Sequence, residues 1–455
     1  MNYQQAQDYI FGYTDYEKVP MPHALASYDL RRVIELLARL GNPHLEARSV
    51  HIGGTNGKGS TAAMIASVLT TSGYATGLYT SPHLNTIRER FTIDRALITE
   101  KEFAAIATRL KPEVEEVNRR ATYGELTTFE LMTALAFTHF SHQKVNFQVL
   151  EVGMGGKFDA TNTIEPEVCV ITSVSLDHTA VLGNSLTKIA TEKAGIIKPN
   201  SVVVLSPQAD DVVQVIEDAC LKQRARLIIV GRDITWRSLG FNGKQQSLEV
   251  NGKLDSYRLS IPLLGHHQLE NAATAVSALE VLRERRFRIS EDSIVDGLAQ
   301  VRWPGRLQVL RRSPLLVVDG AHNPDAARKL KLSLTDYFDF KRAILVMGAS
   351  LDKDVAGVVS ELVPLFDSVI LTQSHHPRAM KATELKAVFR KYGVEVQLAE
   401  NVSEALSLAV GAAGAQDLIC VTGSLFVVAE VIEQASRQDH LAKKKTDTVE
   451  NQRHS

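Results

Sequence analysis

The sequence predicts an α/β protein, with a parallel-sheet domain that includes a small antiparallel sheet, followed by a second, Rossmann-like α/β domain. Short β-branched segments recur along the chain, and each is followed by a segment with helical periodicity. This alternation is typical of parallel strands joined by crossover helices. The chain has 455 residues, which at roughly 100 to 200 residues per domain is enough for two or three domains.

Composition and charge exclude several classes of protein. Hydrophobic residues make up 44% of the chain and charged residues 23%, so neither a disordered nor a fibrous protein fits. Lysine plus arginine (51) balances aspartate plus glutamate (52), and we therefore expect no nucleic-acid partner. The sequence shows neither a signal-peptide pattern nor a membrane-length apolar run, which predicts a cytoplasmic protein with no membrane partner. Cys169, Cys220 and Cys420 lack CxxC spacing and are predicted to be buried thiols in a reducing compartment.

Apolar segments predict the strands of the first domain. Each is apolar enough for a sheet that is covered on both faces. The segments are 49–52, 75–79, 146–152, 168–173 and 201–205. From 234 to 264 the pattern changes to short alternating segments with turns at Asn242-Gly243 and Asn251-Gly252, which predicts the antiparallel sheet. Helical patterns follow at 271–285 and 290–300.

A segment with proline and glycine, 302–306, predicts the boundary between the domains. We expect a first domain at 1–301, a linker at 302–306 and a second α/β domain at 307–437. The strand segments of the second domain are 307–310, 315–318, 343–347, 368–372, 395–398 and 418–422. Residues 438–455 are polar and lack periodicity, so they are predicted to form a tail.

A glycine-rich motif supplies the sharpest functional signal. It directly follows the strand segment 49–52 and opens a helical run, which is the context of a phosphate-binding loop. The motif consists of Gly54, Thr55, Asn56, Gly57, Lys58, Gly59, Ser60 and Thr61. Loop N–H groups, the helix N-terminus and Lys58 would bind phosphate, and Ser60 or Thr61 would reach Mg²⁺. The Walker A spacing is not strict, because Gly59 separates Lys58 from Ser60, so a glycine-rich turn with a solvated lysine stays open.

Two further side chains lie at or after the ends of strand segments in the first domain. Glu151 closes an apolar strand, and His178 comes after the next one. Because the carboxyl ends of parallel strands meet at one edge of a sheet, both could converge with the loop on one Mg²⁺. A histidine is an unusual Mg²⁺ ligand, and each residue taken singly is more often a surface group.

Three other residues remain ambiguous on local grounds. Asp319 and His322 follow the strand segment 315–318, where open α/β sheets bind ligands, so they are candidate substrate contacts. A tight turn before a helix that begins at Pro324 explains them equally well. By pattern alone, Lys193 is interpreted as an exposed, ion-paired lysine on a helix.

Taken together, ordered motifs from about residue 20 to about residue 435 resemble the Mur ligase superfamily, and within it the folylpolyglutamate synthase and dihydrofolate synthase family. The motifs are GTNGKGS at 54–60, Ser81-Pro82-His83 with Glu89-Arg90, Thr128-Phe129-Glu130, EVGMGGKFDATN at 151–162, SLDH at 175–178, IATEKAGIIK at 189–198, LGHHQ at 264–268 with Asn271-Ala272, WPGRLQ at 303–308 and DGAHNP at 319–324. One departure is Lys157, where the family usually has arginine, so bidentate geometry is lost there.

The resemblance implies an ATP-dependent ligase that adds L-glutamate to folates through an acyl phosphate, with ATP and Mg²⁺. It implies a P-loop ATPase domain and a glutamate-ligase domain. The implied catalytic residues are Lys58, Glu151, His178 and Lys193, and the implied metal ligands are Ser60, Glu151, His178 and a carbamylated Lys193. The implied nucleotide contacts are the loop 54–61, Asn271, Arg306 and Asp319. The implied substrate contacts are Arg90, His322 and Ser424 for glutamate, and Ser81, Thr127 and Glu130 for folate.

Several alternatives stay open at this stage. Many bacterial members that also act on dihydropteroate have loops similar to 81–83 and 127–130, which favours a bifunctional enzyme over a monofunctional folylpolyglutamate synthase. A nucleotide switch is disfavoured because no NKxD motif occurs, and a non-catalytic P-loop protein because the four catalytic residue types are present. A cell-wall ligase would need an added amino-terminal domain, for which we expect no room before residue 49. The resemblance also favours a monomer with small-molecule substrates.

Overall fold

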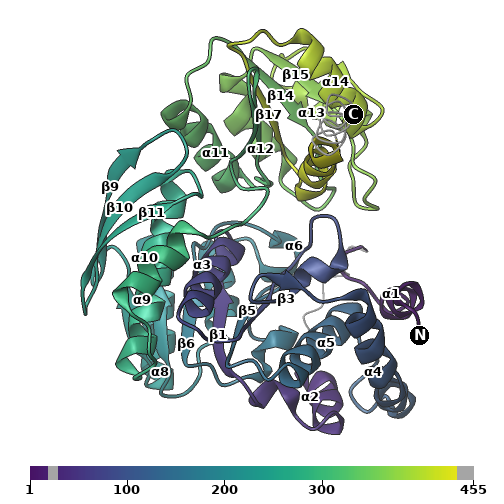
Figure 1. Cartoon of the computed structure of the whole chain (residues 1–455). Coiled ribbons are helices and arrows are strands. Elements are labelled where there is room, and N and C mark those ends of the chain that lie inside the picture. The colour runs from purple at the N-terminus through teal and green to yellow at the C-terminus, as the bar shows by residue number, and fades with distance from the viewer. Residues whose placement is uncertain (19–28, 438–455) are drawn as a thin grey trace, which may run out of the picture. The chain divides into compact units, whose positions relative to one another are not determined.

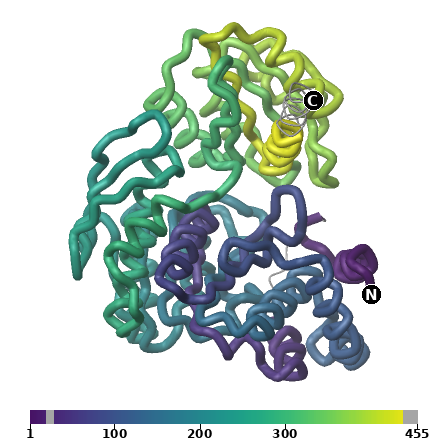
Figure 2. Tube along the Cα trace, in the orientation of Figure 1, coloured from purple at the N-terminus to yellow at the C-terminus, as the bar shows by residue number. Residues whose placement is uncertain are grey.

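The computed structural model describes residues 1–18 and 29–437 (Figure 1), and Figure 2 traces the same chain. This chain divides into two compact units, Met1–Trp303 and the part from Pro304 onward. Each unit contains a largely parallel sheet with helices, so the predicted α/β class is confirmed. The predicted tail at 438–455 lies outside the described residues.

The main sheet of the first unit has the strand order β4-β3-β2-β5-β1-β6-β7-β8. Neighbours from β2 to β8 are parallel, and β3 and β4 add an antiparallel edge. The bounds are β1 Arg48–Gly53, β2 Thr76–Tyr79, β3 Phe91–Ile93, β4 Ala96–Leu97, β5 Phe147–Glu151, β6 Val168–Ile171, β7 Val202–Leu205 and β8 Arg226–Ile229. The five predicted strands are confirmed. The sequence analysis missed β3, β4 and β8. β3 and β4 have only three and two residues, which is too short to show a periodic pattern.

Helices cover both faces of this sheet, since successive strand residues point to opposite faces. Val170 of β6 packs in one core with α3 and α9, whereas its neighbours Cys169 and Ile171 pack in another core with α7 and α8. A third core joins β2 and β3 to α1, α2, α4 and α5. The helices are α1 Tyr3–Phe11, α2 Leu30–Arg39, α3 Lys58–Thr71, α4 Glu100–Arg120, α5 Thr128–His142, α6 Thr179–Leu182, α7 Leu186–Ala194, α8 Asp210–Gln223, α9 His266–Glu284 and α10 Glu291–Ala299, with 3₁₀ turns η2 Pro43–Leu45, η3 Ile87–Arg90 and η4 Ala160–Thr163.

A small antiparallel sheet with the order β11-β10-β9 packs against α9 and α10. Its strands are β9 Thr235–Phe241, β10 Gln246–Asn251 and β11 Ser256–Ile261, so the predicted antiparallel segment and its turns are confirmed. The turn between β10 and β11 is anchored by Glu280 of α9, which is 2% exposed. Its carboxylate accepts hydrogen bonds from the N–H groups of residues 253–255 at 2.7 to 3.2 Å and from the Tyr257 hydroxyl at 3.0 Å.

We expect Glu280→Gln to lower the free energy of unfolding by about 2 to 4 kcal/mol, because an amide nitrogen would then face buried donors. Urea denaturation measures the loss. Glu284→Gln on the same helix is the control. Its carboxylate pairs with Arg226 near the surface, so the loss should stay below about 1 kcal/mol. Equal losses in the two variants would show that Glu280 does not anchor the turn.

The second unit has a sheet with the order β12-β13-β17-β14-β15-β16, parallel except for β12. Its elements are β12 Gln308–Arg312, β13 Leu315–Val318, α11 Pro324–Tyr337, β14 Ala343–Met347, α12 Val355–Leu362, η5 Val363–Leu365, β15 Ser368–Leu371, α13 Ala382–Arg390, β16 Gln397–Leu398, α14 Val402–Ala412 and β17 Leu418–Thr422. All six predicted strand segments are confirmed. Because β13 and β17 are parallel neighbours, the loops that follow them meet at one edge of the sheet.

The structure also shows the lengths of the helices and the state of the three cysteines. Across residues 1–18 and 29–437, every helix is too short or too polar to span a membrane. Cys169, Cys220 and Cys420 are free and buried, as predicted.

Candidate functional site

The glycine-rich loop lies between β1 and α3 and is fastened to the loop that follows β6. The N–H groups of Thr55 and Asn56 both donate to the Ser173 carbonyl, at 2.8 and 3.1 Å. The Asn56 amide also donates to the Ser175 hydroxyl at 3.0 Å. These bonds fix the first half of the loop, while its second half forms the N-terminus of α3, where N–H groups point out of the helix.

Helix α9 closes the other side of the loop. Gly57 has a φ of +88°, and a Cβ at this position would lie 2.4 Å from Oδ1 of Asn271. The Asn271 amide donates to Oε1 of Gln268 at 3.0 Å, and the Gln268 amide donates to the Ser60 hydroxyl at 3.2 Å. The structure therefore brings the predicted residues Gly57, Ser60 and Asn271 together. Gln268, which connects them, lies in a motif quoted above but was given no role.

We expect Gly57→Ala to abolish nucleotide binding, because the added methyl group would push Asn271 away from the loop. Gly73→Ala is the matched control, since Gly73 has a φ of +86° and a Cβ there would meet no described atom within 4 Å. Both variants bear the backbone strain of about 1 to 2 kcal/mol. Calorimetric titration with ATP should separate them, and equal affinities would contradict this account of the loop.

Lys193 of α7 also contacts this loop. It is 4% exposed, and its Nζ donates to the Gly54 carbonyl at 2.7 Å. Burial, reinforced by the charge of Lys58, lowers the pKa of the Lys193 amine to about 7. The interpretation of Lys193 as an exposed lysine is therefore wrong, because Lys193 lies one turn after Ile189 on the buried face of α7. Lys58 itself donates to the Thr55 carbonyl at 3.2 Å.

The predicted metal ligands lie at adjacent strand ends. β5, β1 and β6 are neighbours, so Glu151, the loop and the segment with His178 share the carboxyl edge of the sheet, as predicted. Glu151 is buried and accepts a hydrogen bond from the Ser81 N–H at 3.3 Å. His178 precedes α6 with a φ of +48°, and its Nε2 lies 3.9 Å from a carboxylate oxygen of Asp177.

The predicted metal site contains few of the side chains that commonly bind metals. Within the described ranges, no three His, Cys, Asp or Glu side chains gather closely enough to hold a metal. The predicted set contains only Glu151 and His178 of these types, together with Ser60 and Lys193. The hydroxyl and carboxylate oxygens suit Mg²⁺, which keeps several waters and needs few protein ligands. Metal binding by this set stays a prediction.

A buried network, which the sequence analysis missed, fixes the loop after Glu151. Asp159 accepts hydrogen bonds from the Met154 N–H at 3.0 Å and the Thr161 hydroxyl at 2.5 Å. The Thr161 hydroxyl also lies 2.9 Å from Nε2 of His51. Burial raises the pKa of Asp159 and lowers that of His51 to about 3, so this histidine is neutral. The signal was present in the sequence, because Asp159 lies in the quoted EVGMGGKFDATN motif.

The loop after β2 brings Ser81, His83 and Arg90 together. Arg90 is 1% exposed, and its Nε donates to Nδ1 of His83 at 2.9 Å. Its two terminal nitrogens donate to the two carboxylate oxygens of Glu17, at 2.8 and 2.5 Å. The predicted glutamate contact thus already faces a carboxylate from this chain.

Thr127 and Glu130 form the start of α5. Thr127 donates through its N–H and hydroxyl to Glu130, both at 2.8 Å, in a capping box. Arg32 of α2 donates to the same carboxylate at 2.7 Å. These bonds give Glu130 a structural role that the sequence analysis did not assign, while its contact with folate stays a prediction.

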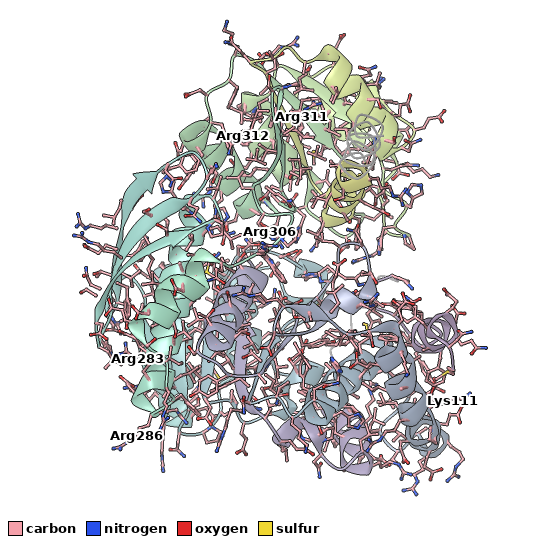
Figure 3. All side chains as sticks on the ribbon, in the orientation of Figure 1. Lys111, Arg283, Arg286, Arg306, Arg311 and Arg312 are labelled. Carbon is pink, nitrogen blue, oxygen red and sulfur yellow. The ribbon has the colours of Figure 1, made fainter. Side chains whose placement is uncertain are left out.

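The second unit brings its own predicted residues together at the edge shared by β13 and β17. Asp319 is buried, which raises its pKa, and it accepts hydrogen bonds from the N–H groups of Leu307 at 2.7 Å and Ala321 at 2.8 Å. Arg306, labelled in Figure 3, and His322 both contribute to the electrostatic environment of Asp319. The Ala321 carbonyl accepts a hydrogen bond from Gly423, directly before Ser424, at 3.0 Å. The roles of these residues in nucleotide and glutamate binding stay predictions.

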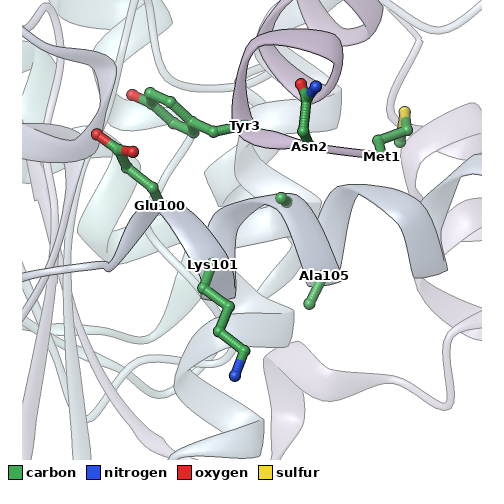
Figure 4. Close-up of a pocket in the computed structure, with 7 residues that line it drawn as sticks. Met1, Asn2, Tyr3, Glu100, Lys101 and Ala105 are labelled. Atoms are coloured by element: carbon green, nitrogen blue, oxygen red, sulfur yellow. The ribbon is translucent and has the colours of Figure 1, made fainter.

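An open pocket lies elsewhere on the first unit, where the start of α1 meets α4 (Figure 4). Its lining is Met1, Asn2, Tyr3, Glu100, Lys101, Ala104 and Ala105. The predicted site residues are not among these seven, so this pocket is separate from the phosphate loop.

Both units match known protein families. Residues 52–279 match the Mur ligase middle domain, and residues 305–425 match the Mur ligase, glutamate ligase domain. The chain is 33% identical to the dihydrofolate synthase/folylpolyglutamate synthase of Bacillus subtilis, over 94% of this chain and 98% of that protein. It is also 33% identical to the folylpolyglutamate synthase of Lacticaseibacillus casei, over 95% of this chain and 98% of that protein.

A longer relative and two solved structures complete the comparison. A probable bifunctional folylpolyglutamate synthase/dihydropteroate synthase of Halobacterium salinarum is 36% identical over 94% of this chain, which spans 51% of that protein. Mycobacterium tuberculosis folylpolyglutamate synthase complexed with ADP is 31% identical, with a TM-score of 0.88 over 95% of this chain and 98% of that chain. A folylpolyglutamate synthase complex with AMPPCP and folate is also 31% identical, with a TM-score of 0.82 over the same shares.

Proposed function

Because the chain belongs to the folylpolyglutamate synthase and dihydrofolate synthase family of Mur ligases, we propose that it is an ATP-dependent ligase that joins L-glutamate to folates. One structural observation supports this proposal in addition to the family membership. The loop 54–61, Glu151 and the His178 segment lie at the ends of three adjacent strands, with Asn271 and Lys193 packed against the loop. This arrangement suits the binding of a nucleoside triphosphate next to a substrate that carries a carboxylate.

In the proposed reaction, a carboxylate oxygen of the folate attacks the γ-phosphorus of ATP, and the bond to the ADP oxygen breaks. The nitrogen of glutamate then attacks the carbonyl carbon of the acyl phosphate. An amide bond forms, the carbon–oxygen bond to phosphate breaks, and the amine loses a proton.

Two negatively charged reactants must meet in this reaction, so positive charge near the phosphates matters most. Lys58 and the N–H groups at the start of α3 would supply it as charge develops on the transferred group. Ser60, Glu151 and His178 would hold Mg²⁺, whose charge would offset that of the phosphates when it is bound. Gln268 would orient the Ser60 hydroxyl, because its amide donates to that oxygen and so occupies one of its two lone pairs.

We further propose that the enzyme is bifunctional and adds glutamate both to dihydropteroate and to folates that already bear glutamate. The name and full-length match of the Bacillus subtilis relative support this proposal. A monofunctional folylpolyglutamate synthase is the second candidate, because the identity to the Lacticaseibacillus casei enzyme is the same, 33%. We also propose a monomer that works in the cytoplasm, where its three free, buried thiols would stay reduced.

Phosphate release by the purified protein tests the proposal. The assay contains ATP, Mg²⁺ and L-glutamate, with either dihydropteroate or a reduced folate monoglutamate as the acceptor. Glutamate-dependent release with both acceptors is the expected result. Release with the folate alone would favour the monofunctional enzyme, and release with neither would contradict the ligase.

A further inference from the structure

The contact between Arg90 and Glu17 has the geometry of substrate recognition. Two parallel N–H···O bonds join the guanidinium to both oxygens of one carboxylate, which is how arginine binds carboxylate ligands. The Arg90 side chain is 1% exposed, whereas that of Glu17 is 31% exposed. Glu17 is therefore the more solvent-accessible partner of the pair.

Arg90 and Glu17 are held by different parts of the chain. Arg90 ends the turn η3, its carbonyl accepts from the Thr80 N–H at 3.3 Å, and its Nε donates to His83. Glu17 lies in the segment after α1, where its own N–H donates to the Asp15 carboxylate at 2.9 Å. The guanidinium is thus positioned by the loop after β2, independently of the carboxylate that it binds.

Arg90 also lies on the carboxyl edge of the main sheet. Its loop contains Ser81, whose N–H donates to Glu151 at 3.3 Å, and Glu151 ends the strand next to β1 and the phosphate loop. A carboxylate bound by Arg90 is therefore at the same sheet edge as the expected site of phosphoryl transfer.

We propose that the Glu17 carboxylate occupies the position on Arg90 that a carboxylate of the incoming L-glutamate takes, and that substrate binding exchanges one for the other. This inference rests on the proposed function. An unpaired guanidinium that is 1% exposed would be costly, and Glu17 neutralises it while the substrate is absent. A ligand must bring an anionic group that accepts both N–H···O bonds in order to replace Glu17, as a carboxylate of glutamate does. Glu17 is therefore a specificity-determining residue that sets the glutamate concentration at which the site fills.

Glu17→Gln tests the exchange, because the amide keeps the shape of the side chain and removes its charge. In thermal unfolding without ATP or folate, the variant should melt below the wild type, and L-glutamate should raise its melting temperature more than that of the wild type. In the ligase assay, the KM for glutamate should fall about fivefold, because the internal competitor is weakened, with the KM for ATP unchanged. Glu113→Gln is the matched control, since Glu113 pairs with Arg39 and is 32% exposed.

If the contact between Glu17 and Arg90 were only a structural ion pair, the two experiments would give different results. Glu17→Gln would then melt lower, and glutamate would stabilise both proteins equally and show an unchanged or higher KM, which would overturn the proposal. Stabilisation by a folate monoglutamate but not by glutamate would overturn the assignment of the ligand. If Glu17→Gln does not fold, Glu17→Asp, which keeps the charge but shortens the reach, must lower the KM for glutamate or the proposal falls. If the wild type shows no ligase turnover, the proposed function is refuted, but the exchange at Arg90 is still tested by the melting experiment, which needs no turnover.

Discussion

Lys58→Ala is expected to lower the turnover number about 10³-fold, the scale seen when a charge that stabilises phosphoryl transfer is removed. Lys58 is the first residue of α3, and its Nζ donates to the Thr55 carbonyl, so the charge is held over the phosphate loop. The KM for ATP should rise as well, because the same charge attracts the bound nucleotide. Steady-state phosphate release gives both constants.

The control for this experiment is Lys222→Ala, which removes an exposed lysine at the end of α8. Its turnover should stay within about twofold of the wild type, as for most surface substitutions. The account of the loop would fail if Lys58→Ala kept more than about a tenth of the turnover while circular dichroism showed an unchanged fold.

Lys193→Met should also lower the turnover number, by about 10² to 10³-fold, because it removes the amine that contacts the loop. The family resemblance implies that this lysine is carbamylated. Its lowered pKa favours the reaction with CO₂, since only a neutral amine forms a carbamate. With a pKa of about 7 against an ordinary value of 10.5, the Lys193 amine loses its proton as the pH rises through about 7.

Activity at a fixed CO₂ concentration should therefore rise across that pH range, and bicarbonate should increase it. Kinetics with and without bicarbonate, together with the ¹³C spectrum of the protein in ¹³CO₂, measure both effects. Lys188→Met, which removes an exposed lysine from the same helix, should keep the bicarbonate response. A wild-type enzyme that is indifferent to bicarbonate and shows no carbamate signal would rule out the modification.

The fold was largely predictable because its strands are buried. Segment 343–347 is apolar throughout and segment 418–422 is apolar except for Thr422, and β14 and β17 have these bounds. β3 and β4 were not predictable in this way, because short antiparallel edge strands depend on pairing with β2 for their existence. The helix α1 was also missed, and its apolar residues Ala6 and Ile10 are buried only through contacts with distant parts of the chain.

The site was predictable where local sequence determines local geometry. The loop 54–61 follows β1 directly and Glu151 is the last residue of β5, so strand order alone brings them together. Residues whose role depends on contacts with distant parts of the chain were harder to predict from the sequence. Gln268, which donates to Ser60, is an example. The position of Glu17 against Arg90 depends on a contact across 73 residues, which no periodicity or spacing in the sequence reveals.

The central claim is that ATP activates a carboxylate of the acceptor for attack by glutamate. It is tested most directly with a folate monoglutamate that carries ¹⁸O in its terminal carboxylate. The account predicts that mass spectrometry will find one ¹⁸O atom in each phosphate released, in proportion to the amide formed. Amide formation with phosphate that lacks the label, the lost ¹⁸O being found in water instead, would contradict an acyl phosphate and with it the proposed ligase mechanism.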